Sequence, residues 1–197
     1  MMHAAPAVGD AAATSPALME AVAAMAGGRP VLLLGEEGDA VLTMAARAVT
    51  PAWVNFMATE ARGLVGLALS LRRAAELGLT LQPRKGRPDA PLYTQSIEAR
   101  RGISTGISAA DRARTILAAE SGTADDIVTP GHVFPQLADE ADLAAMALRL
   151  LRLADGGAVA VLSTILDADG NSADRSVALD LAAAHGIAVL DATELAG

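Results

Sequence analysis

The stretch of residues 101–116 combines two glycines with several hydroxyl side chains and an acid–base pair. Its glycines allow backbone conformations and close approaches that a Cβ atom would prevent. Ser108 followed by Asp111 is typical of an N-cap with an acid at the third helical position, so a helix is predicted over residues 109–120. Unpaired N–H groups at a helix start also favour an anion, so two interpretations are open, an oxygen-ligand cradle or a well-capped helix start. The side chains offered to a ligand are Thr105, Ser108, Asp111 and Arg112.

A second group of chemically capable residues is the acidic turn of residues 35–39, which follows the apolar run of residues 30–34. It carries Glu36, Glu37 and Asp39 within four positions. Carboxylates clustered at the end of a strand can hold Mg²⁺, which takes oxygen ligands and keeps several waters. Glu36 and Glu37 are therefore candidate metal ligands, and a solvated acidic turn is the alternative interpretation.

His132 is the third candidate, and it lies within residues 129–135, where two prolines and a glycine predict a turn-rich connection. Histidine changes charge near neutral pH and serves as a general base or a metal ligand. A satisfied structural histidine is equally compatible with this position.

Composition limits the classes of function. The 197 residues, 52% of them hydrophobic, fit a single domain, which we expect over residues 15–197, after a disordered segment of residues 1–14. A net charge of −8 argues against general binding to nucleic acid or to anionic membranes. The absence of cysteine excludes a disulfide, a thiolate nucleophile and a thiolate metal site. Residues 1–16 lack a signal-peptide pattern and no apolar run approaches about 18 residues, so we expect a cytoplasmic protein without membrane contact.

Strand and helix patterns alternate along the chain. Helices are predicted over residues 17–26, 51–62, 71–77, 109–120, 139–153 and 174–185, and strands over residues 30–34, 64–69, 93–98, 158–166 and 187–190. This alternation predicts an α/β or α+β protein with helices and a sheet in layers.

Five groups of residues stand in the order and spacing of one known family. They are residues 49–51 (Val-Thr-Pro), 55–57 (Asn-Phe-Met), 62–64 (Arg-Gly-Leu), 104–112 (Ser-Thr-Gly-Ile-Ser-Ala-Ala-Asp-Arg) and 130–135 (Pro-Gly-His-Val-Phe-Pro). From Gly28 onward the chain resembles 3,4-dihydroxy-2-butanone 4-phosphate synthase, the riboflavin-pathway enzyme that converts ribulose 5-phosphate to a four-carbon phosphate and formate.

The resemblance implies a layered α/β sandwich with a mixed sheet, a homodimer, and Mg²⁺-dependent sites near the subunit interface. It also implies that His132 is a catalytic residue. The acidic turn matches the family's Arg-Glu-Asn-Glu-Gly-Asp loop in shortened form, so Glu37 and Asp39 are the candidate catalytic acids, and the loop's arginine has no counterpart.

Several positions depart from the family pattern. Residues 140–145 stand where the family has Arg-x-x-Gly-His-Thr-Glu, which binds phosphate and Mg²⁺, so the histidine ligand is not retained. Thr164 stands at the position of a catalytic glutamate, and Gly66 at that of a strand cysteine. Glu140 stands in place of a phosphate-binding arginine, so the substrate phosphate would be repelled rather than attracted. At a separation of about 4 Å and an effective dielectric constant near 20, this repulsion amounts to roughly several kcal/mol.

Three hypotheses follow. The chain is a degenerate synthase that acts as a scaffold or partner protein; or it is an enzyme with altered lyase or isomerase chemistry on another small hydroxy-carbonyl compound; or it is a genuine Mg²⁺-dependent lyase of riboflavin biosynthesis. In the last case a heterodimer with a catalytically complete homologue could supply the missing residues.

Overall fold

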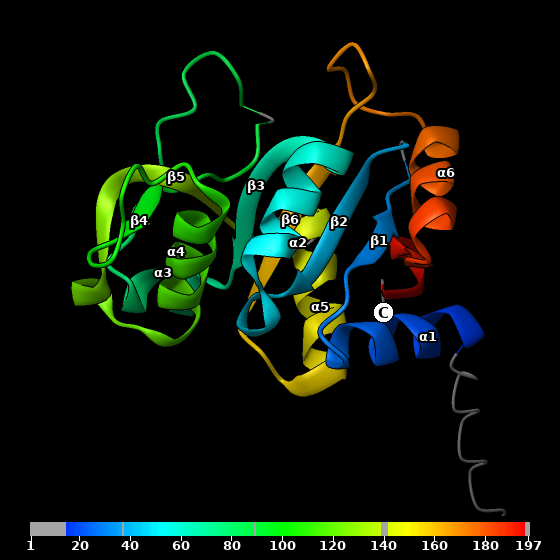
Figure 1. Ribbon diagram of the computed structural model, residues 1–197, viewed down its shortest axis with the longest axis horizontal. Helices are drawn as coiled ribbons and strands as arrows, with labels where there is room; N and C mark the ends of the chain where they lie inside the picture. The colour runs from blue at the N-terminus through cyan, green and yellow to red at the C-terminus, as the bar shows by residue number, and fades with distance from the viewer. Residues whose placement is uncertain (1–14, 37, 89, 139–141, 196–197) are drawn as a thin grey trace, which may run out of the picture.

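The computed structural model describes residues 15–36, 38–88, 90–138 and 142–195 (Figure 1). Its centre is a seven-stranded mixed sheet with the strand order β4-β5-β3-β6-β2-β1-β7. The β1–β7 and β3–β5 pairs are parallel and the other neighbouring pairs are antiparallel. The strands are β1 Val31–Leu34, β2 Ala40–Ala45, β3 Arg62–Leu69, β4 Ile97–Ala99, β5 Ile127–Leu137, β6 Val159–Ile165 and β7 Ala188–Asp191.

Helices cover both faces of this sheet, which confirms the layered α/β architecture. The α-helices are α1 Pro16–Ala26, α2 Pro51–Phe56, α3 Leu71–Glu76, α4 Ala109–Ser121, α5 Leu143–Asp155 and α6 Arg175–His185. Helices α2, α4 and α6 contribute to one buried cluster, and α1 and α5 to a second one on the opposite face. A π-helical segment, η2 Met57–Ala61, connects α2 to β3.

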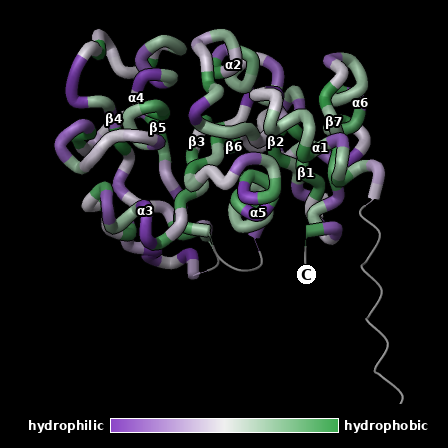
Figure 2. Tube along the Cα trace, turned by 90° about the horizontal axis from the view of Figure 1, so that it is seen from below, coloured by the Kyte–Doolittle hydropathy of each residue, from purple (hydrophilic) through white to green (hydrophobic). Residues whose placement is uncertain are grey.

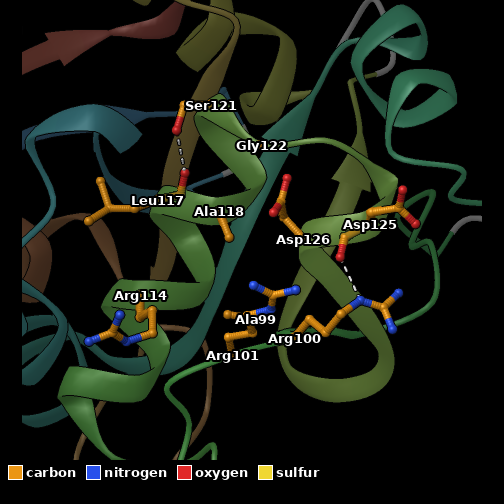
Figure 3. Close-up of a pocket in the computed structure, with 10 residues that line it drawn as sticks. All are labelled: Ala99, Arg100, Arg101, Arg114, Leu117, Ala118, Ser121, Gly122, Asp125 and Asp126. Carbon is orange, nitrogen blue, oxygen red and sulfur yellow. Dashed lines mark hydrogen bonds between the residues drawn. The ribbon is translucent and has the colours of Figure 1, made fainter.

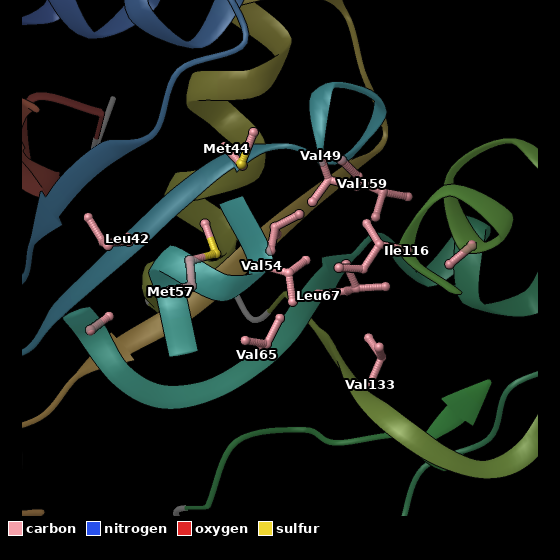
Figure 4. Close-up of a cluster of buried hydrophobic side chains, with 14 of the residues drawn as sticks. Leu42, Met44, Val49, Val54, Met57, Val65, Leu67, Ile116, Val133 and Val159 are labelled. Carbon is pink, nitrogen blue, oxygen red and sulfur yellow. The ribbon is translucent and has the colours of Figure 1, made fainter. Parts of the chain in front are cut away.

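The two hydrophobic clusters are built from aliphatic side chains and methionine, as the composition requires. In the cluster under α2, Met44, Val54, Met57 and Leu67 are completely buried (Figure 4). Hydrophobic segments follow the central strands, whereas hydrophilic ones gather around α3 and α4 (Figure 2).

The predicted helix starts are confirmed by side-chain caps. Ser15 Oγ accepts a hydrogen bond from Leu18 N at 3.0 Å, Thr50 Oγ1 from Trp53 N at 3.2 Å, and Ser70 Oγ from Arg73 N at 3.1 Å. Each cap satisfies an N–H that has no partner within its helix.

The turn-rich connection predicted over residues 129–135 was wrong, because these residues belong to the 11-residue strand β5. Pro135 cannot donate to the ladder, but its carbonyl accepts from Thr94 N at 2.9 Å. At Gly131 a Cβ atom would lie 2.0 Å from Ile97 O, so this glycine permits close approach to β4. Strand β2 also forms in a segment to which the sequence analysis assigned no element.

Among the described residues, no helix combines the length and the apolar content needed to cross a membrane.

Candidate functional site

The loop of residues 101–108, here called the pre-α4 loop, is organised by Asp111. The Asp111 carboxylate accepts hydrogen bonds from Ser104 Oγ at 2.8 Å, Thr105 N at 3.1 Å and Gly106 N at 3.0 Å. The hydrogen bond from the Ser104 hydroxyl, followed by that from the backbone amide of Gly106, lowers the pKa of Asp111 to about 2. Ser108 Oγ caps α4 by accepting from Asp111 N at 3.0 Å. The anion that this loop holds is therefore the chain's own carboxylate, which favours the capped-helix interpretation.

Beneath the pre-α4 loop, Glu98 of β4 and His132 of β5 form a hydrogen-bonded pair. The distance from His132 Nδ1 to Glu98 Oε1 is 2.7 Å, and the two side chains are 44% and 20% exposed, respectively. A Cβ atom on Gly106 would lie 1.6 Å from Glu98 Oε1 and 2.6 Å from His132 Nδ1. The loop thus packs directly on the pair at a position that only glycine can occupy.

The acidic turn borders a different feature, an open cleft of about 1150 Å³, here called the cleft. It lies beside the first turns of α5, over β2, β6, β3 and β5, and is also lined by residues 84, 88 and 90–93. Its sheet residues include Val41, Thr164, Leu64, Gly66, Phe134 and Gln136.

Two positions at which the sequence analysis expects a departure from the family pattern, Thr164 and Gly66, lie on the floor of the cleft. Thr164 is exposed and pairs with Val41 across β6 and β2. Gly66 pairs with Phe134, and a Cβ atom on Gly66 would lie 2.6 Å from Phe134 O. The glycine is therefore required by the local approach of β3 and β5.

Helix α5 begins at the edge of the cleft. Its N-cap Asp142 accepts from Ala145 N at 2.8 Å, and Gln136 Nε2 donates to Asp142 at 3.3 Å. The next two residues, Leu143 and Ala144, also line the cleft and bring no charge to it.

Charges of both signs surround the cleft. Glu36, Asp39 and Asp142 bring carboxylates, and Arg84 and Arg149 bring guanidinium groups. Arg149 Nη1 donates to Leu195 O at 2.8 Å, and Arg84 Nη1 to Ala90 O at 3.0 Å. Burial raises the pKa of the Tyr93 phenol, which lines the same cleft.

The acidic turn carries the carboxylates that are candidates for holding a metal ion. Glu36 and Asp39 are exposed and face the cleft, and Glu37 lies outside the described residues. Within the described part of the chain, no three His, Asp or Glu side chains gather closely enough to hold a metal ion. Among its described residues, the acidic turn thus offers two exposed carboxylates, Glu36 and Asp39, which are of the ligand type that Mg²⁺ takes together with water.

The predicted site residues thus fall into two regions. Glu36 and Asp39 line the cleft, whereas His132, Thr105, Ser108 and Asp111 lie in or beneath the pre-α4 loop. Arg112 is half-buried, burial lowers its pKa, and its Nε has no hydrogen-bond partner among the described residues.

Strand β5 links the two regions. His132 lies two residues before Phe134 in β5, next to the point where the β4–β5 register shifts, and Phe134 and Gln136 line the cleft. Sequence reasoning missed Glu98, Gln136 and Arg149. The alternation of Glu98 with the buried Ile97 and Ala99 in one strand was the only signal that Glu98 faces His132.

A second, smaller pocket of about 370 Å³ lies beside α4 (Figure 3). Three arginines line it, Arg100, Arg101 and Arg114, together with Asp125 and Asp126. Arg100 donates to the carbonyls of Asp125 at 2.5 Å and Ile127 at 3.3 Å, which ties the end of β4 to the start of β5.

Comparison with known proteins identifies the fold and the family. The family model for 3,4-dihydroxy-2-butanone 4-phosphate synthase matches residues 19–197. A synthase of that name from Pseudomonas aeruginosa is 39% identical over 174 residues, which are 82% of this chain and 48% of the relative. One from Cupriavidus pinatubonensis is 36% identical over 191 residues, 90% of this chain and 85% of the relative. The chain therefore spans about half the length of the first relative and most of the second.

Solved structures agree with the sequence matches. A two-domain 3,4-dihydroxy-2-butanone 4-phosphate synthase from A. baumannii superposes with a TM-score of 0.85 at 35% identity, covering 90% of this chain and 56% of the other. A synthase in complex with two magnesium ions gives a TM-score of 0.85 at 27% identity, covering 92% and 95%. On the sequence motifs, the sheet and these matches together, the chain belongs to the 3,4-dihydroxy-2-butanone 4-phosphate synthase family.

Proposed function

We propose that this chain is a divergent family member in which conversion of ribulose 5-phosphate to the butanone phosphate and formate is absent or much reduced, and which acts as a scaffold or partner protein. One observation carries the proposal: Thr164, Leu143 and Ala144 line the same cleft as Glu36 and Asp39. The resemblance puts a catalytic glutamate at the first position and a phosphate- and metal-binding helix start at the other two. The departures from the family pattern therefore fall in one site.

The chemistry of the parent reaction explains why these positions matter. Enolisation, rearrangement and loss of formate need acids and bases to move protons while an electrophile polarises carbonyl oxygens. The threonine hydroxyl at position 164 does not ionise near neutral pH, and the side chains of Leu143 and Ala144 offer no donor to a phosphate. If Mg²⁺ binds, Glu36 and Asp39 are the described residues that would hold it, and it would polarise those oxygens.

The test is a direct assay of the purified chain with ribulose 5-phosphate and Mg²⁺, following formate release. The Cupriavidus pinatubonensis relative, assayed in parallel, is the positive control. We expect a rate at least about 10³-fold below the control, since loss of general acid–base catalysis alone removes 10²–10⁴-fold. A rate comparable with that of the control would overturn the proposal.

A second candidate is an enzyme with altered lyase or isomerase chemistry on another small hydroxy-carbonyl compound. It is favoured by the Glu98–His132 pair and by the charged cleft, which leave a base and carboxylates available. Thermal shift with unphosphorylated sugars and keto acids, with and without Mg²⁺, tests it, because a ligand at 100 times its Kd stabilises by about 2.7 kcal/mol. No shift with any of these compounds would rule against it.

Retained synthase activity in riboflavin biosynthesis is the third candidate, favoured by the 36–39% identity to the named synthases. For this candidate and the first, we propose that the chain works as a cytoplasmic homodimer, or as a heterodimer with a catalytically complete homologue. Mixing the chain with the Cupriavidus pinatubonensis relative and measuring both mass and formate release distinguishes the two assemblies.

A further inference from the structure

We propose that Glu98 and Asp111 are positioning residues that hold His132 in the tautomer with its proton on Nδ1, so that the bare Nε2 accepts a hydrogen bond or a proton from a ligand hydroxyl. This inference rests on the second candidate function, since it names a recognition group for a hydroxylated ligand. The juxtaposition of β4, β5 and the pre-α4 loop carries it.

The hydrogen bond between Glu98 and His132 determines which ring nitrogen carries the proton. An ionised carboxylate only accepts hydrogen bonds, so a 2.7 Å contact with Glu98 Oε1 places the proton on His132 Nδ1. The partner of one imidazole nitrogen decides the state of the other, and Nε2 is then left with its lone pair. A ring that is 44% exposed can present that lone pair to a ligand.

The pre-α4 loop restricts the movement of the Glu98 and His132 side chains. Gly106 has φ +78°, and its α-carbon packs on both members of the pair. Gly106 N donates to Asp111 at 3.0 Å, and two neighbouring residues of the loop donate to the same carboxylate. Asp111 therefore fixes the loop, and the loop limits the rotation of Glu98 and of the imidazole.

The charged groups on the surrounding elements leave Glu98 as the partner of His132. The Asp111 carboxylate faces the amides of the pre-α4 loop. Arg100 and Arg101, at the end of β4, line the second pocket with α4. No hydrogen bond or ion pair joins His132 to a described residue other than Glu98.

The position of His132 along β5 places the Glu98–His132 pair near the cleft, where a ligand would bind. Phe134 and Gln136, which follow His132 along β5, already line the cleft. A hydroxylated ligand that extends from the cleft toward the start of β5 would come within reach of the exposed imidazole. The same geometry would orient a general base for the altered chemistry considered above.

The test is long-range ¹H–¹⁵N NMR of the histidine rings in the full chain at a pH of about 8, above the ordinary histidine pKa of about 6.5. In the unmodified protein we expect a protonated Nδ1 and an unprotonated Nε2 for His132. In Glu98→Gln, whose amide can donate as well as accept, we expect the Nε2–H tautomer to become populated. Asp111→Asn should produce an intermediate mixture, because the loop loosens while Glu98 remains.

The chain offers a matched control in His185, which lies 3.7 Å from Glu60 at an exposed position. Glu60→Gln should leave the His132 signals unchanged, and Glu98→Gln should leave those of His185 unchanged, which also reports that the variant is folded. An Nε2–H tautomer of His132 in the unmodified protein would overturn the proposal, and so would a His132 tautomer unchanged in a folded Glu98→Gln variant.

The outcome is independent of the synthase assay. A full synthase rate would overturn the proposed function and leave the tautomer result standing. The opposite result, an absent activity with an Nε2–H tautomer, would overturn only the positioning role of Glu98. If Glu98→Gln does not fold, the spectrum of the unmodified protein still decides between the two tautomers.

Discussion

The cleft and the pre-α4 loop differ in how their polar residues are held. In the loop, one carboxylate accepts from the hydroxyl of Ser104 and from three successive backbone amides, and the Glu98–His132 pair lies packed beneath. In the cleft, Glu36, Asp39 and Thr164 are exposed, and no side-chain hydrogen bond to a described residue holds any of them. The loop residues thus stabilise the fold whatever the reaction, whereas the cleft residues are free to differ with the ligand.

The largest expected effect is at Gly131, under the Glu98–His132 pair. In Gly131→Ala the new Cβ would lie 2.0 Å from Ile97 O and 2.5 Å from Glu98 N, and neither backbone atom can rotate away. We expect the free energy of unfolding to fall by about 3 kcal/mol or more, measured by urea denaturation. Gly35→Ala, in the acidic turn, is the control and should cost less than about 1 kcal/mol, since the nearest atom would be 3.3 Å away. Equal losses would remove the contrast between the regions.

The second largest effect on stability is expected for Gly66→Cys, which introduces the cysteine that the resemblance implies at this position of the cleft. Gly66→Cys would place a Cβ atom 2.6 Å from Phe134 O, so we expect a loss of about 1–3 kcal/mol in the free energy of unfolding. Leu64→Cys adds a thiol at a 49% exposed position of the same strand and should be nearly neutral. A neutral Gly66→Cys variant would mean that β3 and β5 can separate, and that the cleft is more adaptable than its floor indicates.

A pH-dependent effect is expected at Asp111. Its folded-state pKa of about 2 lies below the unfolded value of about 3.9, so its contribution to stability is complete above the unfolded value and is lost as the pH falls through the folded one. We expect the urea midpoint of the unmodified protein to fall more between pH about 5 and about 2 than that of Asp111→Asn. Parallel pH profiles would show that the loop does not depend on this carboxylate.

The smallest effect is expected at Thr164. Because this side chain is exposed, Thr164→Glu should change the free energy of unfolding by no more than about 0.5 kcal/mol. A loss above about 1.5 kcal/mol would show that the cleft floor is as constrained as the pre-α4 loop. The same variant, assayed for formate release, asks whether this one carboxylate raises the rate.

The local signals in the sequence were sufficient for most elements. Ser15, Ser70 and Ser108 cap helices as their types and positions indicate, since capping depends on residues within one turn. Strand β5 was not predictable in this way. Its prolines and glycine disfavour an isolated strand, but in the folded protein the segment pairs with β3 and β4. Its pairing depends on contacts that are distant in sequence.

The candidate site shows the same division. The acidic turn and His132 were found from residue type alone, but their separation into two regions depends on the sheet order, which places β5 beyond β3 and β6 as seen from β2. Glu98 was missed because an acid in a short strand carries no local mark of its partner on β5. The occupation of the loop amides by Asp111 was also beyond pattern reasoning, since the N-cap motif predicts only the bond from Ser108.

Both borders of the sheet are short: β4 has three residues and β7 has four. A border of this length offers little unpaired backbone to a strand from another chain, so sheet extension between copies is disfavoured. Association of two copies would then rest on side chains of helices and loops, and its strength would be set by surface composition rather than by backbone pairing. The shortness of the two outer strands would thus act against fibrillar aggregation.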